Sequence, residues 1–154
     1  STNISFSKNK NIDYKTNFNG LVTNWGDTDI SFSPNLISSV GFNYSPKKDL
    51  NISILNKFVG DQYMSNTESV VSKLSSYSTT DLNFRYSFKK SKYFNEIILT
   101  AMLNNIFNKE YVSNGYYYTY DDTWSDPNIV TTIEGTGYYP QAKRNFLIGF
   151  TFKL

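Results

Sequence analysis

Apolar and polar residues alternate with a period of two along six segments of this 154-residue chain. Such alternation is typical of β-strands, which place successive side chains on opposite faces. The clearest segment runs from Asp81 to Phe88, where every second residue is apolar. We therefore predict an all-β chain of about six strands. Its apolar series are Ile4, Phe6, Ile12 and Tyr14; Leu36, Val40, Phe42 and Tyr44; Leu50, Ile52, Ile54 and Phe58; Leu82, Phe84, Tyr86 and Phe88; Ile97, Leu99, Ala101 and Leu103; and Phe146, Ile148, Phe150, Phe152 and Leu154.

The connections between these segments alternate in length. They are long at 15–33, short at 45–49, long at 64–76, short at 89–93 and longest at 112–143. Outer-membrane β-barrels have short periplasmic turns and longer extracellular loops. The pattern therefore predicts antiparallel, up-and-down transmembrane strands with every long connection outside the cell. The last strand should then end at the periplasm.

Composition narrows the possible functions. The chain is 18% aromatic, with 13 Tyr and 12 Phe, and it contains no Cys and no His. Without these two residue types it has no usual zinc site, no Ser-His-Asp triad and no disulfide framework. The net charge of +2 comes without a basic stripe, which argues against nucleic-acid binding. We expect no enzyme activity, no cofactor and no metal.

Two other architectures share the same alternation. One is a small, complete outer-membrane barrel with a structural or adhesive role, although such barrels need eight strands. The other is a soluble ligand-binding β-barrel or sandwich, in which the apolar series would point inward. Parity alone does not separate an inner from an outer apolar face.

Three stretches resemble a known family. The run LNNIFNKEY at 103–111 is similar to the penultimate-strand motif of TonB-dependent outer-membrane receptors. The run YYPQAKRNF at 138–146, leading into GFTFKL at 149–154, resembles the last loop and strand of that family, and VGDQY at 59–63 is similar to one of its strand ends. Residues 1–154 would then be one C-terminal segment of the receptor barrel. Two positions depart from the family pattern, because Leu154 stands where Phe is usual and Leu147 where a polar residue is expected.

The resemblance implies the last six strands of a 22-stranded barrel in the bacterial cell outer membrane. It also implies energy-coupled uptake of siderophore-iron, haem, cobalamin or an oligosaccharide. The implied partners are membrane lipid, the remaining strands and plug, the TonB complex and the small-molecule nutrient. The plug domain and the TonB box are not recognised in this sequence, so we expect it to be part of a larger protein.

Three groups of residues are candidates for function. The polar parity of the strands is expected to face the barrel lumen, and the final strand to carry the barrel-assembly signal. The aromatic residues of the longest connection are expected to contact the substrate, because Tyr and Trp offer rigid amphipathic contact area. A self-packed loop remains the alternative for these aromatics. The lumen-facing residues are Asn51, Lys57, Asp81, Asn83 and Arg85; the assembly residues are Phe146, Ile148, Phe150, Phe152 and Leu154; and the substrate-binding residues are Tyr116, Tyr117, Tyr118, Tyr120, Trp124, Tyr138 and Tyr139.

Overall fold

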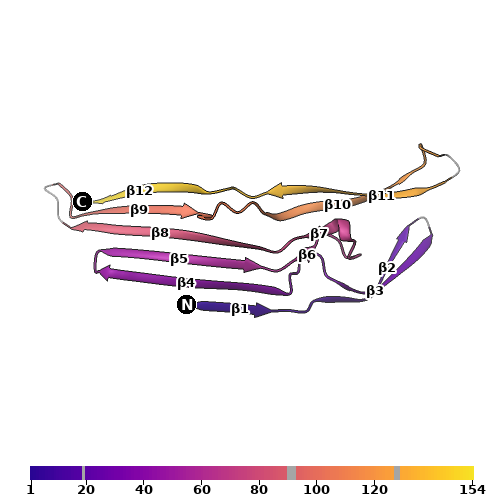
Figure 1. The fold of residues 1–154 in the computed structure, drawn as a ribbon, viewed down its shortest axis with the longest axis horizontal. Coiled ribbons are helices and arrows are strands. Elements are labelled where there is room, and N and C mark those ends of the chain that lie inside the picture. Colours follow the sequence, from indigo (N-terminus) through magenta and orange to yellow (C-terminus); the bar gives the residue numbers. More distant parts are fainter. Residues whose placement is uncertain (19, 90–92, 127–128) are drawn as a thin grey trace.

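The computed structural model describes residues 1–18, 20–89, 93–126 and 129–154, and these fold into antiparallel β-structure. Six strands form one open sheet in the order β1-β4-β5-β8-β9-β12 (Figure 1). Each of these strands is antiparallel to its neighbours. The sheet strands are β1 (Thr2–Phe6), β4 (Leu36–Lys47), β5 (Leu50–Val59), β8 (Tyr77–Lys89), β9 (Glu96–Asn104) and β12 (Asn145–Lys153). The predicted all-β, antiparallel architecture is confirmed.

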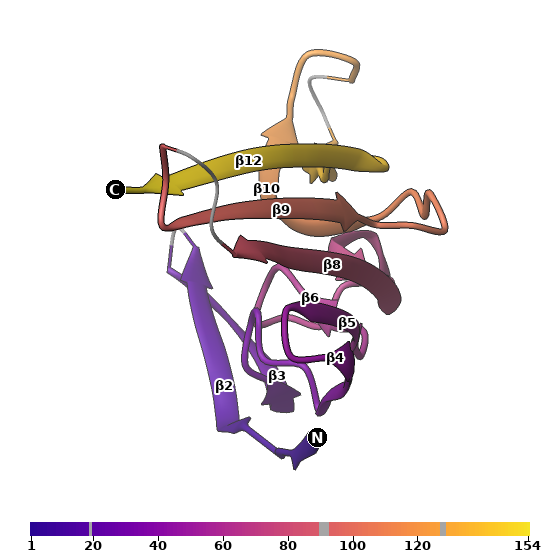
Figure 2. The same ribbon diagram turned by 90° about the vertical axis from the view of Figure 1, so that its left-hand side faces the viewer.

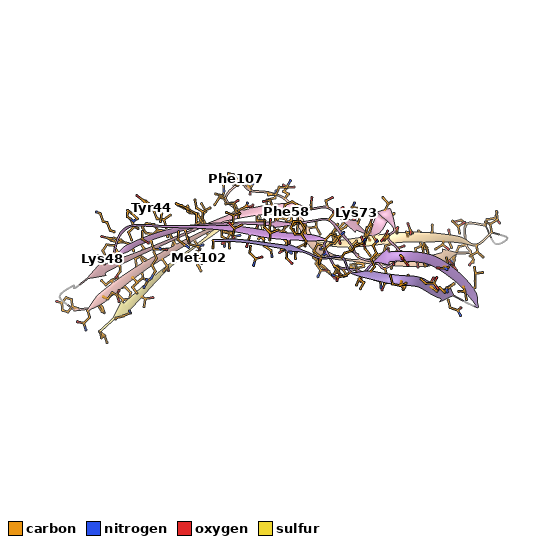
Figure 3. All side chains as sticks on the ribbon, turned by 90° about the horizontal axis from the view of Figure 1, so that it is seen from below. Tyr44, Lys48, Phe58, Lys73, Met102 and Phe107 are labelled. Carbon is orange, nitrogen blue, oxygen red and sulfur yellow. The ribbon has the colours of Figure 1, made fainter. Side chains whose placement is uncertain are left out.

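The register joins the predicted apolar series into one face. Phe42 pairs with Ile54, which pairs with Leu82, and residues that pair across antiparallel strands point to the same side. The same face continues through Leu103 to Phe146. Figure 3 shows the sheet edge-on, with Tyr44 labelled on this face and Met102 on the other. We call these two sides the apolar face and the polar face.

The long connections all lie at one end of the sheet. The hairpins β2 (Lys10–Phe18) with β3 (Leu21–Asp29) and β10 (Val112–Asp122) with β11 (Thr131–Pro140) project from that end, which we call the hairpin end (Figure 1). The connection between β4 and β5 and the C-terminus lie at the opposite, turn end. The second predicted short connection falls partly on residues 90–92, outside the described residues. The predicted alternation of long and short connections therefore corresponds to the two ends of the sheet.

The first predicted strand is wrong in one respect, because it divides into two elements. β1 ends at Phe6, and Ile12 and Tyr14 belong to β2. The backbone amide of Ser7 donates to the carbonyl of Asn35, and the Ser7 hydroxyl donates to the carbonyl of Pro34. These bonds hold the chain at the point where it leaves the sheet. The alternation continued through this break, so it concealed the change of direction.

Residues 61–74, which we call the central connection, lie between the two hairpins. They contain the short strands β6 (Gln62–Tyr63) and β7 (Lys73–Leu74) and a 3-10 helix, η1 (Val70–Ser72). Lys73 Nζ and Asp61 Oδ2 form an ion pair of 2.5 Å. The hydrogen bond from Lys73 lowers the pKa of the Asp61 carboxyl.

The part of the chain that the structure describes contains no membrane-spanning α-helix.

Buried apolar side chains are few and lie mostly near the hairpin end. Leu74 is 2% exposed, Met64 7% and Val59 6%. The end-on view in Figure 2 shows the sheet as an open, curved wall. The apolar face of the sheet is therefore exposed, and an exposed apolar surface of this size marks a site of contact with a partner.

Candidate ligand-binding surface

The hairpin β10–β11 has a continuous register over most of its length. It runs without a shift from the pair Asn114–Tyr139 to the pair Asp122–Thr131. A regular antiparallel ladder keeps every second side chain on one face. Four aromatic residues therefore share one face, which we call the tyrosine row: Tyr116, Tyr118, Tyr120 and Tyr139.

The rings of the tyrosine row are nearly parallel. The centroids of Tyr116 and Tyr118 are 6.2 Å apart with planes at 26°, and those of Tyr118 and Tyr120 are 6.4 Å apart at 17°. These separations are close to the repeat of about 6.6 Å between alternate residues of a strand. Tyr139 extends the row at 6.1 Å from Tyr116, with its plane tilted by 52°. All four side chains are about half exposed.

Two glycines on β11 make room for these rings. Gly135 pairs with Tyr118, and Gly137 pairs with Tyr116. A Cβ atom on either glycine would overlap the Tyr ring that pairs with it. Each ring therefore covers backbone on one side and leaves its other side to solvent. The spacing of two residues between the glycines equals the spacing between the tyrosines, and this matched spacing is what keeps the row flat.

The opposite face of the hairpin packs on the central connection. The Tyr117 hydroxyl donates to Glu134 Oε1 at 2.5 Å, and the Ser69 hydroxyl donates to Glu134 Oε2 at 3.0 Å. Burial of the ring, together with the bond to Glu134, raises the pKa of Tyr117, so it remains a neutral donor. A Cβ atom on Gly115 would overlap Met64. Tyr117 is therefore a packing residue in this arrangement.

The seven aromatic residues predicted to contact substrate do not form one surface. Tyr138 pairs with Gly115 and so lies on the same side as Tyr117, away from the tyrosine row. Trp124 lies at the tip and is 89% exposed. There Asp122 Oδ1 accepts the backbone amide of Trp124 at 2.8 Å, and the Ser125 hydroxyl donates to Oδ2 at 2.7 Å. The bond from Ser125 lowers the pKa of the Asp122 carboxyl, so this acceptor stays charged at neutral pH.

Asn105 anchors the base of this hairpin, a role that the sequence analysis missed. Its side chain is 4% exposed, and its φ of +50° is in the left-handed region. Its Nδ2 donates to the carbonyls of Lys109 and Ala142, and its Oδ1 accepts the amide of Lys109 at 2.9 Å. Its own amide donates to Asp81 Oδ1 at 2.8 Å. The sequence feature that could have indicated this role is an Asn next to a turn, because Asn adopts the left-handed region more readily than most residues.

The five residues predicted to face the lumen do share the polar face. Asn51 pairs with Arg85, and Lys57 pairs with Thr79. Asn83 pairs with Met102, so this face also contains apolar side chains. Asp81 contributes to the base of the hairpin through Asn105. On the final strand, the alternate residues Phe146 to Phe152 lie on the apolar face.

No group of three or more acidic side chains placed to hold a metal ion occurs within the described residues. A search of known protein families finds no model that matches the chain. No curated protein matches it either. The function is accordingly inferred from the geometry of the chain and from the motifs quoted above.

Proposed function

We propose that this chain forms six adjacent strands in the wall of an outer-membrane β-barrel receptor that takes up a scarce nutrient. The observation that carries the proposal is the continuous apolar face of the sheet, which is open to solvent. Phe42 is 62% exposed, Phe146 74% and Phe150 61%. An apolar surface of this extent in a polar chain requires a partner, and lipid hydrocarbon fits a band that spans all six strands.

The length of the apolar band along the strands also supports a barrel wall. On β4 the band runs from Leu36 near the hairpin end to Tyr44 near the turn end. On β12 it runs from Phe146, which pairs with Leu103, to Phe152, which pairs with Ile97. Barrel strands carry an outward-facing apolar band of this kind across the hydrocarbon layer.

The main polar exception on the apolar face is hydrogen-bonded within the protein. Asn56 Nδ2 donates to Thr80 Oγ1 at 2.8 Å, to Ser78 Oγ at 3.0 Å and to the carbonyl of Thr79 at 3.1 Å. Polar groups in hydrocarbon cost several kcal/mol unless they are bonded internally. The Asn56 amide therefore does not contradict a lipid-facing surface.

The proposal assigns a role to each remaining surface. β1 and β12 each have a neighbour on one side in the sheet, and their outer edges would pair with the other strands of the barrel. The polar face would line the lumen and contact the plug. The hairpin end would lie outside the cell and meet the substrate, whose import would be driven by the TonB complex. Phe146 to Leu154 would carry the assembly signal at the periplasmic end.

Single cysteines test this orientation, because the chain itself contains none. In the intact protein, with any other cysteines replaced, we expect Trp124→Cys to react with a membrane-impermeant maleimide on whole cells. The matched control is Lys48→Cys at the turn end, which is exposed but should react only after the outer membrane is permeabilised. Equal labelling of both sites on whole cells, or a protein that leaves the membrane fraction without detergent, would contradict the proposal.

A further inference from the structure

We propose that the tyrosine row binds an uncharged linear oligosaccharide whose sugar rings lie on the open sides of Tyr116, Tyr118 and Tyr120. The part of this inference that concerns import rests on the receptor function proposed above. The part that concerns binding of the oligosaccharide depends only on the hairpin. The first argument is shape. The three rings repeat at 6.2 and 6.4 Å along a straight ladder, which suits a ligand that itself repeats along a line.

The second argument is the chemistry of the row. One side of a sugar ring presents C–H bonds, which pack on an aromatic face, while hydroxyl groups project from its rim. The rings here are tyrosines, so each has a hydroxyl at its own rim. The same face carries Asn114 and Thr131, whose side chains can donate and accept hydrogen bonds, as sugar hydroxyls require. A purely aromatic ligand would gain nothing from this polar border.

The third argument is charge. Residues 111–139 contain no Lys and no Arg but four acidic residues. Asp121, Asp122 and Glu134 accept hydrogen bonds within the hairpin or from the central connection. Asp121 accepts the Thr132 hydroxyl, Asp122 holds the tip, and Glu134 accepts Tyr117 and Ser69. The negative hairpin repels anionic ligands, such as haem propionates and ferric chelates of carboxylates.

A cationic ligand is also disfavoured by the arrangement. Asp121 and Glu134 lie on the face opposite the tyrosine row. Asp122 is on the same side as the row, but it lies at the tip beyond Tyr120, where both of its oxygens accept hydrogen bonds. A cation on the rings of Tyr116 or Tyr118 would therefore lack a carboxylate counter-ion beside it. A neutral chain of sugars needs none.

The test is calorimetric titration of the intact, detergent-solubilised receptor with uncharged hexasaccharides of glucose, mannose, xylose and fructose, and with haemin and ferric citrate. We expect at least one hexasaccharide to bind. Tyr118→Ala should then weaken its Kd about tenfold, because stacking on one ring is worth roughly that factor. Tyr118→Phe should weaken the Kd less, by about twofold to threefold, because it keeps the ring and removes only one hydroxyl. The matched control is Tyr138→Ala, since Tyr138 and Tyr118 are both 48% exposed but lie on opposite faces.

The inference is overturned if no hexasaccharide binds, or if Tyr138→Ala weakens binding as much as Tyr118→Ala. This failure is distinct from failure of the receptor function. A protein that shows the expected cysteine labelling but binds haemin regardless of Tyr118 would retain the proposed receptor role and exclude the oligosaccharide. A protein outside the membrane fraction that binds hexasaccharide through Tyr118 would do the reverse.

Discussion

The two hairpins that project from the sheet differ in the regularity of their ladders. In β10–β11 the register is continuous above its base, and the tyrosine side chains align. In β2–β3 the register shifts on both sides of Tyr14, and Asp13 adopts a φ of +51°. Bulges bend and twist a hairpin, so alternate side chains no longer lie in one plane. A flat aromatic surface therefore depends on a ladder without bulges.

Glycine has a different task in each hairpin. Gly26 of β2–β3 has a φ of +71°, and a Cβ atom there would meet nothing within 4 Å. Gly137 of β10–β11 is not in the left-handed region, but a Cβ atom there would overlap Tyr116. In the first hairpin glycine supplies a backbone conformation, and in the second it supplies space. The same residue type thus supports an irregular ladder in one hairpin and a flat surface in the other.

The largest expected effect of a substitution is at the base of β10–β11, where Asn105 holds the chain. Asn105→Ala would remove the hydrogen-bond partners of Lys109 and Ala142 and place alanine at a positive φ. We expect the local opening of residues 112–140 to become easier by about 2 kcal/mol, or roughly thirtyfold faster amide exchange. Hydrogen exchange measured by mass spectrometry on the intact protein checks this. Residues 10–29 are the internal control, and a uniform increase in both hairpins would show that Asn105 does not act locally.

The second prediction distinguishes a glycine that is needed for lack of a side chain from a glycine that is needed for its positive φ. Gly137→Ala should destabilise β10–β11 by about 1 to 3 kcal/mol through overpacking against Tyr116. Gly26→Ala should cost about 1 kcal/mol because alanine resists a positive φ. The distinguishing measurement is rescue. Gly26→Asn should keep more amide protection than Gly26→Ala, because Asn accepts a positive φ. Only the second substitution Tyr116→Ala should relieve Gly137→Ala. Rescue of both sites by Asn would make the two glycines equivalent.

The smallest effect is expected at the base of β2–β3. Lys10 Nζ lies 3.0 Å from Asp29 Oδ1 and 3.6 Å from Glu68 Oε1 at the protein surface. Such pairs contribute little and are screened by salt. The hydrogen bond to Asp29 raises the pKa of Lys10 above 10.5, so its contribution is complete below that pH and is lost only as pH rises through the higher folded value. Lys10→Met should therefore increase exchange of residues 10–29 slightly at neutral pH and not at all in high salt.

Much of the sheet followed from periodicity, because one face of each sheet strand is mostly apolar. Even the exceptions are consistent with the register, since Leu55 lies on the polar face and Asn56 on the apolar face. The hairpin β10–β11 was predicted as a connection without strands. Its sequence places aromatic residues on both faces at Tyr116, Tyr117 and Tyr118, which hides a period of two. Tertiary contacts with the central connection distinguish these faces, and a single sequence does not contain them.

The tyrosine row itself left a trace in the sequence that was not used. Glycines at 135 and 137 have the same spacing as Tyr116 and Tyr118, and matched spacings on two strands indicate facing positions. The lumen-facing role of the polar face and the assembly role of the final strand stay predictions, because the structure gives only the positions of these side chains. Periodicity predicts which face of a strand a residue occupies. The residue that it pairs with on the next strand depends on the register, which periodicity does not give.

The closed base of β10–β11 makes this hairpin an exchangeable unit. Its ends are adjacent, since Val112 pairs with Pro140 and the amide of Gln141 donates to the carbonyl of Tyr111. It leaves from β9 and returns to β12, which are neighbours in the sheet. Replacement of residues 112–140 by another hairpin would thus leave the register of the wall unchanged. Recombination between related genes at these two points would exchange the surface of the hairpin without any change in the strands beneath it.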